Sequence, residues 1–215
     1  MKNKKGKIMT KKQQKKQTIL FLGDSISDNA FNRRTKHLRS NPAYPEQFAR
    51  AHKEFNCICK GIASNRSYHV YDRLTKDCIA LCPDIVVLLI GVNDAWEHYV
   101  PEQYPPLLRD FQPHFAEIMR RLNSELPHSK VVIMTPFLVS AIAEKMPFRA
   151  FLAPYVDFIT EQAQRYGFPI IDLQSVFDAA EKQHAPVELA SDGVHPTVLG
   201  HSYILKNLEN AVLSK

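Results

Sequence analysis

Residues 19–29 read ILFLGDSISDN, an apolar run that stops at Gly23 and is followed at once by an acid and a hydroxyl. One interpretation is a strand that ends in a turn, because Gly, Asp, Ser and Asn favour turns through local hydrogen bonds. The other is a nucleophile, since a serine just past the carboxyl end of a buried strand projects into the crevice where open α/β sheets bind ligands. The motif alone favours the turn, because short motifs often match by chance.

Four further apolar runs recur along the chain. The five runs are TILFLGDS from Thr18, FNCICKG from Phe55, DIVVLLIG from Asp84, KVVIMTPF from Lys130 and FPIIDL from Phe168. They are continuous rather than alternating, which is typical of parallel strands buried on both faces. Helical patterns separate them, at 44–52, 68–81, 103–126 and 148–166, and a last helix follows Pro196. This alternation predicts one doubly wound α/β domain over residues 18–215.

The first seventeen residues differ from the rest of the chain. They contain eight lysines and no acid, and they lack the apolar segment of a secretory signal. We expect residues 1–17 to be a basic, disordered tail that is dispensable for activity. The remaining 20 basic residues face 22 acidic ones and form no basic stripe interleaved with aromatics, so we expect no specific nucleic-acid partner. No apolar stretch is long enough to span a bilayer.

The four cysteines form two pairs. Cys57 and Cys59 share one face of a predicted strand, and Cys78 and Cys82 share one face of a predicted helix. Both pairs suit buried apolar positions, whereas structural zinc takes its thiolates from turns. We therefore expect no metal site, and the free thiols together with the absence of an export signal predict a cytoplasmic protein.

Candidate catalytic residues occur at two kinds of position: after predicted strands and just before the last helix. Ser25, Ser64 and Asn93 come after the first three strands, and Asp192 and His195 stand three apart in SDGVHPTVLGH. Histidine can take the proton of a serine hydroxyl, and a carboxylate can fix the imidazole tautomer. Backbone N–H groups and an Asn amide can meet the oxyanion. Each cluster alone also suits a turn or a helix cap, but together they indicate acyl transfer.

The sequence resembles the SGNH or GDSL hydrolases. FLGDSIS is similar to the nucleophile block, LLIGVNDAW to the block with the oxyanion asparagine, and SDGVHPTVLGH to the block with Asp and His. DCIALCPDIVVLLIGVNDAWEHY and VVIMTPF look most like the bacterial branch that includes acetyl-xylan esterases. The resemblance implies a flavodoxin-like three-layer α/β/α sandwich with a five-stranded parallel sheet, no cofactor, and ester hydrolysis through an acyl-serine. It casts Ser25, Asp192 and His195 as the triad, with Ser25, Ser64 and Asn93 forming the oxyanion hole.

The second block departs from that branch. The branch usually reads GISGN, whereas this chain reads GIASN at residues 61–65, with Ser64 at the position of the second glycine. A backbone donor survives the exchange, but a positive φ at Ser64 would cost about 1 kcal/mol or more. Activity or acyl size is therefore expected to differ from that of the branch.

These observations predict a serine esterase that removes a short acyl group, most directly acetyl, from a carbohydrate or similar polar alcohol. Trp96 is a candidate for contact with the sugar or the acyl group, although a core position suits it equally. His201 is expected to be structural. The alternatives are a lysophospholipase or thioesterase, and a binding protein that keeps an idle triad on the same scaffold. A homo-oligomer is compatible with the sequence.

Overall fold

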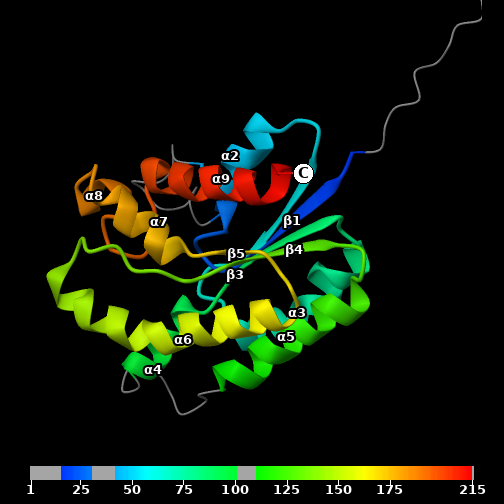
Figure 1. The fold of residues 1–215 in the computed structure, drawn as a ribbon, viewed down its shortest axis with the longest axis horizontal. Coiled ribbons are helices and arrows are strands. Elements are labelled where there is room, and N and C mark those ends of the chain that lie inside the picture. Colours follow the sequence, from blue (N-terminus) through cyan, green and yellow to red (C-terminus); the bar gives the residue numbers. More distant parts are fainter. Residues whose placement is uncertain (1–15, 31–41, 101–109, 215) are drawn as a thin grey trace, which may run out of the picture.

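The computed structural model describes residues 16–30, 42–100 and 110–214. Five parallel strands form one sheet in the order β2-β1-β3-β4-β5 (Figure 1). Their bounds are β1 Thr18–Gly23, β2 Asn56–Gly61, β3 Ile85–Leu89, β4 Lys130–Met134 and β5 Ile170–Ile171. The predicted α/β class and the five-stranded parallel sheet are confirmed.

Helices cover both faces of this sheet, and alternate strand residues divide the core between them. Ile19 and Phe21 of β1 pack in one cluster with helices α2 (Tyr44–Ala51), α7 (Leu173–Ala180) and α9 (Val198–Leu213). Leu20 and Leu22 pack in the other cluster with α3 (Ser67–Asp77) and α5 (Phe111–Glu125). The helix α6 (Met146–Arg165) contributes its first half to the first cluster and its second half to the other. Figure 1 shows the resulting three layers.

The strand order reverses at β1, which has β2 on one side and β3 on the other. Ligands of doubly wound sheets bind outside the carboxyl ends of the strands at such a point. Ser25 follows β1 and Asn93 follows β3, so the topology brings the first and third polar clusters of the sequence to the two sides of this crevice.

Two glycines let the turn after β1 lie against the ends of its neighbours. A Cβ at Gly23 would lie 2.3 Å from the carbonyl oxygen of Leu89, and one at Gly61 would lie 2.4 Å from the carbonyl carbon of Ser27. Both contacts are with backbone, which cannot move aside as a flexible side chain would. The absence of a side chain at these positions therefore fixes the height of residues 24–28 above the sheet.

Several element boundaries differ from those predicted. The helix expected at 68–81 ends at Asp77 and continues as a 3₁₀ turn at Ile79–Leu81. Cys82 then takes φ 44° and is exposed, so the prediction that it is buried was wrong. Cys78 is buried as predicted, while Cys57 and Cys59 are only half-buried. β5 has only two residues because α7 already begins at Leu173. The helix predicted at 103–126 is present as α5, Phe111–Glu125, while its first residues, 103–109, lie outside the described residues, as do residues 1–15 of the predicted tail.

Three helices had no counterpart in the predicted pattern. They are α4 (Val92–Tyr99), α7 and α8 (Pro186–Leu189). Each is at most eight residues long and therefore shows few repeats of an apolar period; α2 has the same length as α4 and α7 but was predicted at 44–52. α4 matters most for the site, because it begins immediately after β3 and carries Asn93 in its first turn.

Gly61→Ala should destabilise the fold by about 2–3 kcal/mol, because its methyl group would overlap the backbone of Ser27 and Asp28. Gly167→Ala is the matched control: nothing lies within 4 Å of a Cβ there, and only its φ of 68° opposes the substitution, at a cost of about 1 kcal/mol. Urea unfolding of both variants measures the difference. Equal losses would contradict the close approach at Gly61.

Candidate active site

Ser25, His195 and Asp192 form a continuous hydrogen-bonded chain. Ser25 Oγ lies 2.9 Å from His195 Nε2, and His195 Nδ1 lies 2.6 Å from Asp192 Oδ2. Ser25 belongs to the turn after β1, while the other two residues belong to the loop between α8 and α9. The structure thus brings together three residues that the sequence separates by up to 170 positions.

Asp192 is held in place by hydrogen bonds from the backbone of its own loop. Asp192 Oδ1 accepts from the N–H groups of Val194 and His195, at 2.9 and 2.7 Å. Burial raises the pKa of this carboxyl, but the hydrogen bonds from His195 and Val194 outweigh burial and leave the pKa of Asp192 well below its usual range. The ionised carboxylate therefore favours the tautomer with a proton on His195 Nδ1, in which Nε2 accepts from the Ser25 hydroxyl.

Asn93 is anchored through its own amide and through its neighbours. Its Nδ2 donates to the carbonyl oxygen of Asn65 at 3.0 Å. Asp94, the next residue, accepts from the N–H and the hydroxyl of Ser67 at the start of α3. An ion pair between Arg66 and Glu97 also joins α3 to α4. These contacts give the Asn93 amide a fixed orientation beside β3, and its second N–H is free of that bond.

Ser64 lies in the turn after β2, is exposed, and has φ 62°. This is the left-handed conformation that glycine adopts without steric cost, so the strain expected from the exchange of the block-two glycine is present. Ser64 is not one of the described residues that line the cavity beside His195. The structure therefore brings Asn93 to the triad more directly than Ser64.

A cavity of about 310 Å³ opens beside the triad. Its lining, among the described residues, consists of Val92, Asn93, Trp96, Lys145, Phe148, Asp192, Val194 and His195. Trp96 packs edge-on against Phe148, with 4.9 Å between ring centroids, so it is at once a wall of the cavity and part of the packing. The packing role weighed for Trp96 is thus present, while its contact with a sugar or an acyl group stays a prediction.

Lys145 is a cavity residue that no motif indicated. It ends the 3₁₀ turn Ala143–Lys145, its Nζ donates to the carbonyl oxygen of Asp192 at 2.7 Å, and it lies 5.9 Å from the Trp96 ring centroid. A lysine in an irregular segment gives no periodic signal, so only the tertiary fold reveals it. Its ammonium group adds a positive charge beside the triad.

The model of the GDSL-like lipase/acylhydrolase family matches residues 21–203, which include Ser25, Asn93, Asp192 and His195. The chain belongs to this family. The resemblance seen in its three motif blocks is thereby confirmed, and the protein is an ester-cleaving hydrolase.

The chain also matches known relatives over most of their length. The chain is 28% identical over 208 residues to an acetylxylan esterase of Geobacillus stearothermophilus, covering 87% of this chain and 90% of the relative. The crystal structure of the acetylxylan esterase Axe2 from that organism has a TM-score of 0.75 at 25% identity, over 93% of this chain and 95% of that one. The α/β hydrolase LAE5, from the metagenome of Lake Arreo in Spain, has a TM-score of 0.73 at 24% identity, over 91% and 94% of the two chains.

Two other features bear on what this family member can bind. Within residues 16–30, 42–100 and 110–214, no three His, Cys, Asp or Glu side chains gather in a way that would hold a metal ion. Over the same ranges, no helix has both the length and the apolar character needed to cross a membrane.

Two buried ionisable groups, Asp24 and His201, lie near His195. Burial raises the pKa of Asp24 to about 7; one of its oxygens accepts from the N–H of Ile26, and the other has no hydrogen-bond partner in the described structure. Burial lowers the pKa of His201 to about 3, so this histidine stays neutral. It packs against the ring of Tyr44, which fits a structural rather than a proton-transferring residue.

Asp24→Asn should flatten the pH dependence of stability. The folded state keeps a proton on Asp24 that the unfolded chain releases above its usual pKa of 3.8. The stability that this group contributes is therefore complete below that value and is lost as the pH rises through about 7, by at most on the order of 4 kcal/mol. Urea unfolding between about pH 5 and 8 measures this loss. The exposed Asp157→Asn is the control, and parallel curves for wild type and Asp24→Asn would contradict the assignment.

Proposed function

We propose that the protein hydrolyses short-chain esters, most directly acetyl esters, of carbohydrates or similar polar alcohols through an acyl-serine intermediate. The observation that carries this proposal is the preformed chain Ser25–His195–Asp192 beside a small cavity with an aromatic and a cationic side chain. It requires no cofactor, because the nucleophile, the base and the oxyanion donors all come from the protein.

The first half of the reaction acylates Ser25. As its Oγ attacks the ester carbonyl, His195 Nε2 takes the hydroxyl proton, and Asp192 stabilises the imidazolium through Nδ1–H. The tetrahedral oxyanion accepts from the backbone N–H groups of Ser25 and Ser64 and from the side-chain amide of Asn93. His195 then gives its proton to the departing alcohol oxygen.

In the second half of the reaction, water takes the place of the alcohol and hydrolyses the acyl-serine. His195 removes a proton from a water molecule, the hydroxide attacks the acyl carbonyl, and the same donors meet the second oxyanion. Collapse breaks the bond to Ser25 Oγ, which regains its proton from His195. The carboxylic acid leaves, and the starting hydrogen-bonded chain is restored.

The lining of the cavity supports a short acyl group and a polar alcohol. Burying a long acyl chain there would desolvate the Lys145 ammonium and the Asn93 amide without replacing their hydrogen bonds, which is costly. The Trp96 ring and the polar groups around it instead suit an alcohol with both apolar and hydroxyl surfaces. This favours a carbohydrate ester over the lysophospholipid or thioester of the runner-up function.

The relatives support the same substrate class. The related protein of Geobacillus stearothermophilus is an acetylxylan esterase, and the structure of an Axe2 mutant, at 26% identity, is that of an acetyl-xylooligosaccharide esterase. Catalytic mutants of Axe2 replace a serine in one case and an aspartate in another. A binding protein with an idle triad would have no use for the aligned hydrogen bonds of Ser25, His195 and Asp192, so we favour the enzyme.

The roles assigned to these residues set an order of mutational effects. Ser25→Ala and His195→Ala should each lower kcat by roughly 10³-fold or more, and the double variant little further, because the two act as a unit. Asn93→Ala removes one of three donors and should lower kcat by roughly 10²- to 10³-fold. Asp192→Asn should also be damaging. Steady-state hydrolysis of p-nitrophenyl acetate measures kcat for all five variants.

His201→Gln is the matched control for these variants, since it alters the other histidine of the same segment. It should keep most of the activity of the folded enzyme. If His201→Gln abolished turnover while His195→Ala retained it, the assignment of the base would be wrong.

The polar lining of the cavity sets the expected acyl preference. Within a series of p-nitrophenyl esters from acetate to decanoate, kcat/KM should be highest for the shortest acyl groups and fall steadily with length. A clear preference for the long-chain esters would contradict the short-acyl proposal and favour the lysophospholipase or thioesterase alternative.

A further inference from the structure

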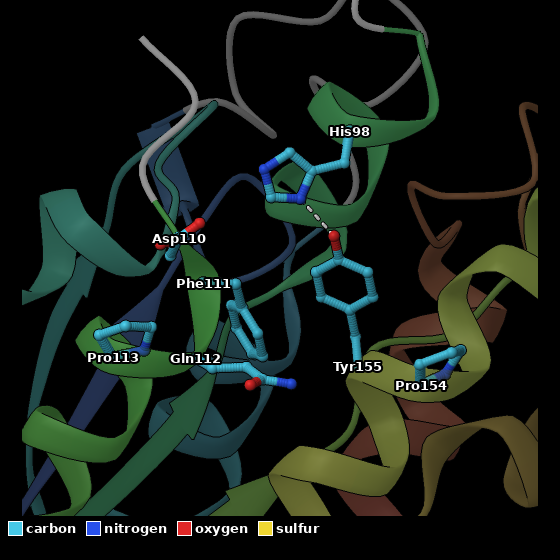
Figure 2. Close-up of a pocket in the computed structure, with 7 residues that line it drawn as sticks. All are labelled: His98, Asp110, Phe111, Gln112, Pro113, Pro154 and Tyr155. Carbon is cyan, nitrogen blue, oxygen red and sulfur yellow. Dashed lines mark hydrogen bonds between the residues drawn. The ribbon is translucent and has the colours of Figure 1, made fainter.

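A second cavity lies between α4, α5 and α6, away from the triad. It has a volume of about 370 Å³ and is lined, among the described residues, by His98, Asp110, Phe111, Gln112, Pro113, Pro154 and Tyr155. Figure 2 shows these side chains arranged around a common space, with His98 from α4 and Tyr155 from α6 joined by a hydrogen bond. Its volume falls in the range of cavities that hold small ligands.

The lining combines ring faces with hydrogen-bonding side chains. Phe111 and Tyr155 pack with their ring centroids 5.0 Å apart, and His98, Gln112 and the Tyr155 hydroxyl offer donors and acceptors. No lysine or arginine lines this cavity within the described ranges, and Asp110 would repel an anion. An acyl chain would desolvate the His98–Tyr155 pair without replacing its hydrogen bonds to water. A sugar fits better, because its C–H faces pack on rings while its hydroxyls bind polar groups.

The same two helices line both cavities. On α4, Trp96 belongs to the catalytic cavity and His98 to the second. On α6, Phe148 belongs to the catalytic cavity and Tyr155 to the second, seven residues or about 10 Å further along the axis. The second cavity therefore lies within reach of an oligosaccharide whose ester sits at Ser25.

Aromatic rings fill the interval between the two cavities. Trp96 lies 5.8 Å from Tyr99, Tyr99 lies 5.3 Å from Phe151, and Phe151 lies 6.2 Å from Tyr155, between ring centroids. Phe151 is 37% exposed. A run of rings with an exposed member is a surface on which successive sugar residues can pack.

We propose that the cavity of His98, Phe111, Gln112 and Tyr155 is a distal sugar subsite, which binds a residue of an acetylated oligosaccharide remote from the ester under attack. This inference rests on the carbohydrate-ester function proposed above. The helices α4 and α6 then line both binding sites. The catalytic cavity positions the scissile acetyl group, and the second cavity selects substrates by chain length.

Two small substitutions test the subsite. Tyr155→Phe removes one hydroxyl, and Gln112→Ala removes one exposed amide. Each should raise KM for acetylated xylo-oligosaccharides about three- to tenfold, the effect of one lost hydrogen bond, with little change in kcat. KM and kcat for p-nitrophenyl acetate, which has no sugar to place in the second cavity, should not move.

The chain offers matched controls. Tyr203 forms a similar pair with His184, at 3.0 Å, outside the described lining of both cavities. Tyr203→Phe, and Gln183→Ala at another exposed glutamine, should leave both substrates unaffected.

The outcomes separate this inference from the proposed function. If wild type cleaves both substrates and neither Tyr155→Phe nor Gln112→Ala changes KM for the oligosaccharide, the subsite is refuted and the esterase proposal stands. If wild type cleaves p-nitrophenyl acetate but not acetylated oligosaccharides, the carbohydrate part of the proposed function fails and the subsite with it. An equal rise in KM for both substrates would show a structural effect and also overturn the subsite.

Discussion

The hydrogen bond between Ser25 and His195 joins residues 170 positions apart, and most of the fold serves to make it possible. The position of Ser25 is fixed by its turn, which packs closely against the ends of β2 and β3 because Gly23 and Gly61 lack side chains. His195 is fixed from the other end of the chain by α8 and α9, where a Cβ at Gly200 would meet the carbonyl oxygen of Leu189 at 2.2 Å. Three close backbone contacts that only glycine allows thus hold the segments that carry the two partners of this hydrogen bond.

The carboxyl groups near this bond are kept in different states by their surroundings. Asp192 receives two backbone N–H groups and the His195 ring, which together favour its anion in spite of burial. Asp24, adjacent to Ser25, is buried with one oxygen unpartnered in the described structure, and burial raises its pKa to about 7. Asp24 is accordingly protonated over much of the acidic range, while Asp192 remains ionised to orient the imidazole. Different environments, rather than different residue types, separate the two roles.

The apolar runs were sufficient to predict the sheet, and one topological rule was sufficient to place Ser25 and Asn93 at the same crevice. Asp192 and His195 follow no strand, and only their spacing and the family resemblance linked them to this site. The rule works because parallel strands end at one edge, so short polar motifs at strand ends meet there. It could not reveal α4, which begins after Gly91 at φ 122° and buries Asp94 and Glu97 as well as Val92 and Ala95, so that no apolar stripe marks it in the sequence. Nor could it reveal Lys145 or the second cavity, since both arise where α6 packs beside α4. The exposure of Cys82 likewise follows from a local left-handed turn that ends the helical pattern early.

The central claim is that Ser25 is the nucleophile, activated by His195. A fluorophosphonate probe, which phosphonylates activated serines, tests it directly when peptide mapping by mass spectrometry locates the label. We predict one label per chain, on the peptide that contains Ser25, lost in Ser25→Ala and formed much more slowly in His195→Ala. Labelling of another residue, or no labelling of the folded wild-type protein, would contradict the account.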